Sequence, residues 1–249
     1  MRSFDGKGGQ VTIFIIVAIM IVSVLLVFFL WAQPTYFSEG VGIKGFEGCV
    51  EDALESGISE LEGKAGFIEA DFTYSYNGEE LTYLCYTNNF YETCVVQVPF
   101  LKNVFDENLE ALIRDDVDAC YDASLASLRE EGYDVDSGAV DYNVEIEPGA
   151  VRLEIDAPVS VGSQSFARFS VEANAPVYDM VMIATSILQF ETKYGDSDVS
   201  SMMLYYPDYY IEKIKRGEGT TIYVLEHKTF GNKFKFASRS LVFPAGYDI

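Results

Sequence analysis

The chain has 249 residues, of which 39 are acidic and 17 basic, so its formal net charge is −22. A surface with this charge repels nucleic acid and anionic lipid headgroups, which excludes nucleic-acid binding from the expected functions. The chain holds four cysteines and a single histidine. The chain therefore has few of the residues that usually bind metal ions or support nucleophilic catalysis.

An uncharged segment lies near the N-terminus, at residues 11–32, with the sequence VTIFIIVAIMIVSVLLVFFLWA. At about 1.5 Å per residue it makes a helix of about 33 Å, enough for a hydrocarbon core of about 30 Å. We therefore expect a transmembrane helix, with the lipid bilayer as its partner. The alternative is a cleaved secretory signal, but such signals have shorter apolar cores and end at a small-x-small site.

The flanks of this segment predict its orientation. Arg2 and Lys7 precede it, whereas residues 33–43 contain no basic residue. Because basic residues are retained on the cytoplasmic side, residues 1–10 are expected to be a short cytoplasmic leader. Residues 33–249 then form an extracellular domain of a single-pass cell-membrane protein.

The stretch KGGQVTIF at residues 7–14 resembles the class III signal sequence of archaeal type IV pilin-like proteins. The resemblance implies cleavage between Gly9 and Gln10. Filament-forming members carry Glu five residues into the mature chain, where this sequence has Phe14, so it departs from the pattern that supports filament assembly. The N-terminus also resembles archaeal single-pass proteins that begin with GQ-x-TIF and continue with a Cys-Val helix, here Cys49-Val50. A plain N-terminal anchor remains the alternative.

The four cysteines all follow the predicted anchor, and an even number on the exported side predicts disulfides. Cys85 and Cys94 flank a predicted turn at residues 88–89, and symmetric strand pairing would place them opposite each other. Cys49 and Cys120 lie on the apolar faces of two predicted helices. We therefore predict the pairs Cys49–Cys120 and Cys85–Cys94. A zinc site is the alternative, but the Cys-x8-Cys spacing fits no common zinc pattern, and no metal site is expected.

Hydrophobic periodicity predicts an α+β fold in which helices pack on antiparallel sheets. A helix at 46–61 is followed by strands at 67–76, 81–86 and 91–98, with Asn77-Gly78 as a hairpin turn. Asn103 is expected to cap a second helix that runs to about residue 131 and ends at Gly132. Strands at 140–147, 151–161 and 164–173 follow, separated by turns at 148–149 and 162–163.

The last part of the chain repeats this order. Pro176 begins a helix at 177–194 that ends at Gly195, and strands are expected at 209–215, 221–228 and 233–241. The pattern indicates three α-β-β-β units, at 45–98, 103–173 and 176–241. Their duplication is a hypothesis about pattern, since the units share no residue-level identity.

We expect no catalytic residue and no cofactor. His227 is expected to be exposed on a strand, and the chain has no GxSxG-like elbow that would supply a nucleophile beside it. Adjacent helical residues do not face each other, so the acidic pairs at 115–116 and 130–131 are interpreted as solvated. The segment Asp196-Ser197-Asp198 begins like a calcium loop but lacks the glycine and closing glutamate of an EF-hand.

The best binding candidate is an aromatic segment formed by Tyr205, Tyr206, Tyr209 and Tyr210. Tyrosine offers a large contact area at low entropic cost, which suits an envelope protein or glycan as partner. The alternative is a half-buried strand entry. Lys and Phe alternate at 230–236, which is interpreted as an edge or hairpin strand whose lysines protect an edge.

These observations favour a non-catalytic, membrane-anchored cell-envelope protein with a pilin-like or surface-interaction role. A homo-oligomer through the N-terminal helix is compatible with that role. The alternative is the extracytoplasmic ligand-binding component of a receptor or transport complex, which would need a cytoplasmic partner.

Overall fold

The computed structural model describes residues 16, 19–23, 45–162 and 164–242. The chain divides into two units, Met1–Gly42 and Ile43–Ile249. Within the described residues, no helix is long and apolar enough to cross a membrane. The leader at 1–10, the Gly9-Gln10 site and most of the predicted anchor at 11–32 lie outside the described residues.

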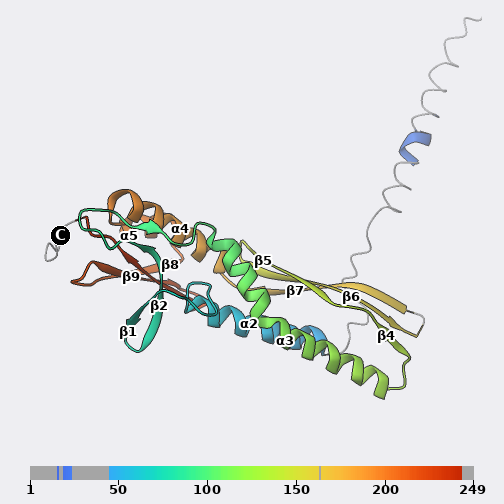
Figure 1. Ribbon diagram of the computed structural model, residues 1–249. Helices are drawn as coiled ribbons and strands as arrows, with labels where there is room; N and C mark the ends of the chain where they lie inside the picture. Colours follow the sequence, from blue (N-terminus) through green and yellow to red (C-terminus); the bar gives the residue numbers. More distant parts are fainter. Residues whose placement is uncertain (1–15, 17–18, 24–44, 163, 243–249) are drawn as a thin grey trace, which may run out of the picture. The chain divides into compact units, whose positions relative to one another are not determined.

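The second unit is an α+β fold (Figure 1). Its helices are α2 (Phe46–Glu62), α3 (Leu101–Glu130), α4 (Val177–Tyr194) and α5 (Val199–Tyr205). One sheet has the order β1 (Thr73–Tyr76), β2 (Glu79–Tyr86), β10 (Lys233–Arg239), β9 (Thr220–His227) and β8 (Tyr209–Lys215), with β3 (Val95–Val96) also paired to β2. The other contains β4 (Val135–Ser137), β5 (Asp141–Glu147), β6 (Ala150–Val161) and β7 (Gln164–Asn174), with β6 paired to the other three.

The three predicted units do not form three separate sheets. The strands of the first and third units share one sheet, because β10 pairs in parallel with β2 through Ala237↔Tyr83 and Arg239↔Tyr86. Only the four-stranded sheet comes from a single unit. Strand β10 therefore lies between β2 and β9, but only its residues 237–239 pair with β2. Residues 233–236, which carry the lysines, pair with β9 alone, as expected for a hairpin strand.

Helices α2 and α3 lie side by side (Figure 1). Their buried positions recur every three or four residues, as expected for amphipathic helices. At Gly57 a Cβ atom would lie 2.6 Å from Ile113 Cγ2 and 2.8 Å from Leu109 Cδ1. A larger residue at this position would force the Ile113 and Leu109 side chains or the helices to shift.

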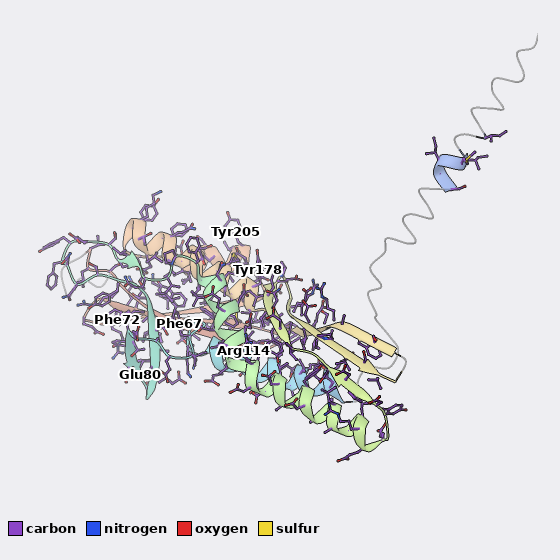
Figure 2. All side chains as sticks on the ribbon, turned by 45° about the vertical axis from the view of Figure 1, so that its right-hand side comes forward. Phe67, Phe72, Glu80, Arg114, Tyr178 and Tyr205 are labelled. Atoms are coloured by element: carbon purple, nitrogen blue, oxygen red, sulfur yellow. A yellow bond between two sulfur atoms is a disulfide. The ribbon has the colours of Figure 1, made fainter. Side chains whose placement is uncertain are left out.

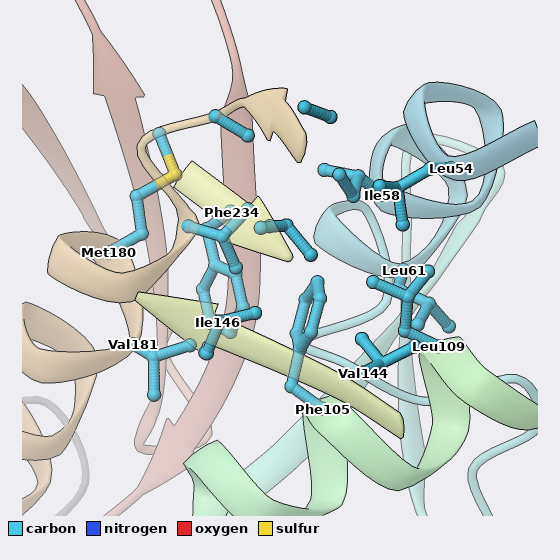
Figure 3. Packing of buried hydrophobic residues seen from close by; sticks show 14 of the residues in the cluster. Leu54, Ile58, Leu61, Phe105, Leu109, Val144, Ile146, Met180, Val181 and Phe234 are labelled. Atoms are coloured by element: carbon cyan, nitrogen blue, oxygen red, sulfur yellow. The ribbon is translucent and has the colours of Figure 1, made fainter. Parts of the chain in front are cut away.

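A single large core joins the helices to both sheets. Figure 3 shows Leu54, Ile58 and Leu61 of α2 facing Phe105 and Leu109 of α3, with side chains of β5, α4 and β10 around them. Helix α4 contacts β2 and β10 of one sheet and β5 and β6 of the other. It therefore links the two sheets.

The β1–β2 hairpin covers the other face of the six-stranded sheet. Strands β1 and β8 lie at opposite edges, yet the Tyr74 hydroxyl donates to Glu218 Oε1 at 2.7 Å in the β8–β9 turn. The guanidinium of Arg216 lies 5.6 Å from the ring centroid of Tyr76. The hairpin thus folds across the sheet and buries a second, smaller cluster that includes Leu81 and Ile222.

Several predicted boundaries hold. Helix α4 spans the predicted residues and ends where Gly195 adopts φ 74°, and the strands β5 to β7 form the predicted meander. Asn77 and Gly78 have φ values of 52° and 86°, as the predicted hairpin turn requires.

Other boundaries were wrong for local reasons. The predicted strand at 67–76 is reduced to Thr73–Tyr76, since Ala65 and Gly66 turn the chain and Phe67 and Ile68 pack on the core. The strand at 91–98 is reduced to Val95–Val96, because the backbone of Tyr91 has φ 68°. Asn103 does not cap α3, which begins at Leu101 after Phe100. Helix α5 and strand β4 were not predicted.

Candidate functional site

Both disulfides join the cysteines that the sequence pairs. Cys49–Cys120 links α2 to α3 with Cα atoms 5.9 Å apart, and Cys85–Cys94 has a Cα separation of 5.4 Å. The second pair does not form through the expected symmetric register, because Cys85 lies opposite Val96. The connectivity is as predicted, but an irregular loop brings Cys94 to its partner.

The four predicted tyrosines do not form one surface. Tyr205 is 84% exposed at the end of α5, on the outside of the domain (Figure 2), whereas Tyr209 is only 4% exposed. Tyr206 is half-buried, with its ring 6.4 Å from that of Tyr209. Tyr210 is exposed but points to the other face of β8, because side chains alternate along a strand. The strand-entry interpretation therefore holds for Tyr209, and Tyr205 remains a surface candidate.

Helix α5 positions Tyr205 and has a capping signal in the sequence. Asp198 Oδ1 accepts hydrogen bonds from the backbone N–H groups of Ser200 at 3.1 Å and Ser201 at 3.3 Å. These bonds satisfy free donors at the helix start. The neighbouring Asp196 forms ion pairs with Lys213 and, at 3.2 Å, with Lys215. The segment that begins like a calcium loop is thus used for capping and ion pairing.

Two segments lie next to each other at this end of the sheet: residues 204–208, which comprise the end of α5 and the α5–β8 connection, and the β9–β10 turn at residues 228–232. We call them the paired loops. The Lys228 N–H donates to the Asp208 carbonyl at 2.9 Å, and Lys228 Nζ donates to the Pro207 carbonyl. Leu204, Tyr205 and Phe230 are exposed on them. Strand pairing between β8 and β9 creates this surface, so Phe230 could not be assigned to it from sequence.

His227 lies beneath the paired loops and is 9% exposed, so the prediction of an exposed histidine is wrong. Its ring packs between Tyr209 and Phe230, with centroids 4.9 Å from each. Nδ1 accepts hydrogen bonds from the N–H groups of Thr229 at 3.3 Å and Phe230 at 3.1 Å. The imidazole accepts at Nδ1 only in its neutral form, so neutral His227 organises the turn.

A buried carboxyl group completes this layer. Glu62, at the end of α2, is 3% exposed, and both its oxygens accept from Asn232 Nδ2, at 2.9 and 2.8 Å. Burial raises the pKa of Glu62 to about 7, although the hydrogen bond from Asn232 acts in the opposite direction. Sequence reasoning missed Glu62, whose only signal is that it extends the apolar stripe of α2 by one position.

Tyr209 connects this layer to α4. Its hydroxyl donates to Asp179 Oδ2 at 3.2 Å and lies 3.4 Å from the Pro176 carbonyl. Burial raises the pKa of Tyr209, as do the negative charge of Asp179 and the hydrogen bond to it. The exposed side chains of the paired loops therefore stand on a layer of buried, hydrogen-bonded groups.

A second buried acid lies elsewhere in the core. Glu191 of α4 accepts from the Tyr223 hydroxyl through Oε1 and from Ser238 and Ser240, both at 3.2 Å, through Oε2. Its hydrogen-bonding capacity is used within the fold, and Glu191 joins α4 to β9 and β10.

The remaining acidic groups do not form a metal centre in the described part of the chain, where no three potential ligands converge. The acidic pair at 115–116 is exposed on α3, as predicted. A polar groove of about 320 Å³ lies between α3 and β5. Its Lys102 is paired with Asp106 at 2.9 Å and Glu145 at 3.4 Å.

No protein-family model matches the chain, and no curated protein or solved structure proved similar to it.

Proposed function

We propose that this protein is a non-catalytic, single-pass membrane protein whose N-terminal helix holds an acidic α+β domain outside the cytoplasm. The observation that carries the proposal is the pair of disulfides in that domain, since such bonds persist in oxidising compartments. The uncharged segment at 11–32, preceded by Arg2 and Lys7, supports the anchor and its orientation.

The paired loops are the proposed contact surface for an envelope protein or glycan. Leu204 and Tyr205 are the two most exposed large apolar side chains in the described residues, at 83% and 84%. Exposed aromatic side chains on a rigid support are typical of binding surfaces, because little conformational entropy is lost on association.

Limited proteolysis tests the topology. Intact cells are treated with protease, and the domain is expected to be degraded while a cytoplasmic marker stays intact. Degradation only after lysis would refute the proposed orientation. Mass spectrometry of the native N-terminus separates a processed chain that begins at Gln10 from a plain anchor that retains residues 1–9.

A binding experiment tests the surface. The full chain in detergent micelles is incubated with isolated envelope glycan and with envelope proteins, and Leu204→Ser/Tyr205→Ser is compared with wild type. The control is Tyr133→Ser, because Tyr133 is also exposed but lies after α3. We expect binding to be lost only in the double variant; equal binding by all three chains would refute the assignment.

A further inference from the structure

Strand β7 forms one edge of the four-stranded sheet. It pairs with one side of β6, whose other side carries β5 and β4. In the described chain, no backbone N–H or C=O group of residues 169–174 has a partner outside the β6–β7 pair. Because alternate residues of an antiparallel edge strand point these groups outward, this part of β7 presents a row of donors and acceptors to which another strand can bind.

The edge strands β5 and β8 are protected by neighbouring helices. Asp106 of α3 accepts from the Ile146 N–H of β5 at 2.9 Å, and the Ile211 N–H of β8 donates to the Met203 sulfur of α5 at 3.4 Å. Strand β8 also carries lysines, which discourage strand addition. Residues 169–174, with the sequence FSVEAN, contain no lysine, proline or glycine. This edge therefore lacks the features that usually prevent pairing with another chain.

Opposite charges face each other on the solvent side of this sheet. Arg168 of β7 lies opposite Asp156 of β6 and donates to it from Nε at 2.7 Å. Glu172, further along β7, lies opposite Arg152 and accepts from its Nε at 2.9 Å. The exposed Ser170 lies midway between Arg168 and Glu172. The exposed side of β7 is therefore complementary in charge to the same strand reversed about Ser170.

We propose that two copies of the protein associate by antiparallel pairing of their β7 strands, with a twofold axis perpendicular to the sheet at Ser170. Arg168 of each copy then faces Glu172 of the other, which continues the charge pairs of each sheet into the next. On the core side, Phe169 of each copy faces Val171 of the other. Moving the axis by one residue would place Arg168 or Glu172 opposite Ser170, and moving it by two would bring two like charges together.

Helix α2 leaves room for this pairing. The ring of Phe46, at the start of α2, lies 5.5 Å from that of Phe169, and Glu62 at the end of α2 is bonded to Asn232 of the paired loops. The helix therefore runs from the proposed axis toward the six-stranded sheet. Its copy runs in the opposite direction, so only the first turns of the two helices come close to each other.

The formal net charge of −22 opposes self-association, so the range of the charges decides. At about 0.15 M salt the Debye length is about 8 Å, and charges farther apart than this are largely screened. Residues directly opposite in paired strands have Cβ atoms about 5 Å apart, so the Arg168–Glu172 pairs keep much of their attraction. The association uses neither the paired loops nor the N-terminal helix, and it is independent of the proposed function.

Charge reversal in the full chain, studied in detergent micelles at this salt concentration, tests the register. Sedimentation equilibrium measures the dimer dissociation constant of wild type, Arg168→Glu and Glu172→Arg. Each variant alone places two like-charged pairs across the axis and is expected to dimerise at least about tenfold more weakly than wild type. An equimolar mixture of the variants restores both opposite-charge pairs and should dimerise at least about tenfold more tightly than either variant alone.

The mixture also controls for local damage, because each variant loses an ion pair within its own chain that mixing does not restore. Recovery in the mixture therefore reports pairing across the axis. The proposal is overturned if wild type is monomeric, or if the mixture dimerises no better than the single variants. It is also overturned if all samples dimerise equally, as expected for a dimer held by the N-terminal helices alone.

A cysteine at the axis gives a second test. Ser170→Cys places two thiols on directly opposite residues, whose Cα atoms lie about 4.5–5.5 Å apart, which suits a disulfide. The four native cysteines are already paired with each other. Mild oxidation is expected to give a covalent dimer of Ser170→Cys, whereas the matched control Ser127→Cys, exposed on α3, should stay monomeric. Equal cross-linking of the two variants would refute the pairing of β7 strands.

Discussion

At the scale of single residues, the described structure contains one buried side-chain polar atom without a hydrogen-bond partner, the Tyr121 hydroxyl. The hydroxyl of Tyr223, in contrast, donates to Glu191. We expect Tyr121→Phe to leave stability unchanged or raise it by up to about 1 kcal/mol, and Tyr223→Phe to lower it by about 1–3 kcal/mol, because an acceptor loses its donor. Urea denaturation measures both; a larger loss in Tyr121→Phe would contradict the assignment.

Glu62 gives a second prediction at this scale. Its folded-state pKa of about 7 lies above the ordinary value of 4.5, so the folded chain binds this proton more tightly than the unfolded chain. The stabilisation is fully present below pH 4.5 and is lost as pH rises to about 7. The free energy of unfolding should fall by about 3 kcal/mol over this interval through this group. The free energy of unfolding is measured as a function of pH for wild type and Glu62→Gln, and the difference between the two curves isolates the contribution of Glu62. Parallel curves would disprove it.

At the scale of elements, the α2–α3 contact depends on Gly57, and α2 contains its own control. A methyl group at Gly57 would overlap Ile113 and Leu109, whereas a Cβ at Gly48 meets nothing within 4 Å. Gly57→Ala is expected to lower the free energy of unfolding by about 1–3 kcal/mol, because the added methyl group overpacks the contact. Gly48→Ala should stabilise by about 0.5–1 kcal/mol, because alanine is the better helix former. Thermal unfolding measures the melting temperatures of the two variants. If Gly57→Ala melted at a higher temperature than Gly48→Ala, the helices would be able to separate at this point.

The disulfides give a second prediction for elements. Cys49–Cys120 closes a loop with a sequence separation of 71 and Cys85–Cys94 one of 9. Each disulfide constrains the unfolded chain, and its removal should lower the free energy of unfolding. Replacing the first pair by alanine should lower it by about 4 kcal/mol, and replacing the second by about 2.5 kcal/mol. Chemical denaturation of the two double variants measures this difference. A larger loss for the short loop would indicate that local packing dominates.

At the scale of the whole molecule, the six-stranded sheet needs strands from both ends of the second unit. The parallel β2–β10 pair joins segments far apart in sequence, and α4 contacts both sheets. Residues 176–242 expressed alone are therefore expected to be unfolded, although they correspond to a predicted unit. Circular dichroism and amide chemical-shift dispersion test this. A cooperatively folded fragment would support independent units.

The sequence by itself determined the elements with strong local signals. The apolar stripe and glycine end of α4, the β5–β7 meander and the Asn77-Gly78 turn depend on periodicity and turn chemistry, which operate over a few residues. The two cysteine pairs also followed from local reasoning, although the register at Cys85 did not.

The tertiary structure alone decided the rest. Pairing of β10 with β2 joined the first and third predicted units in one sheet, and pairing of β8 with β9 buried Tyr209 and His227 and left Tyr205 and Phe230 outside. The burial of Glu62 beneath Asn232 joins residues 170 positions apart. Such contacts cannot be inferred from a local pattern, because the free energy that selects them comes from burying distant parts of the chain together.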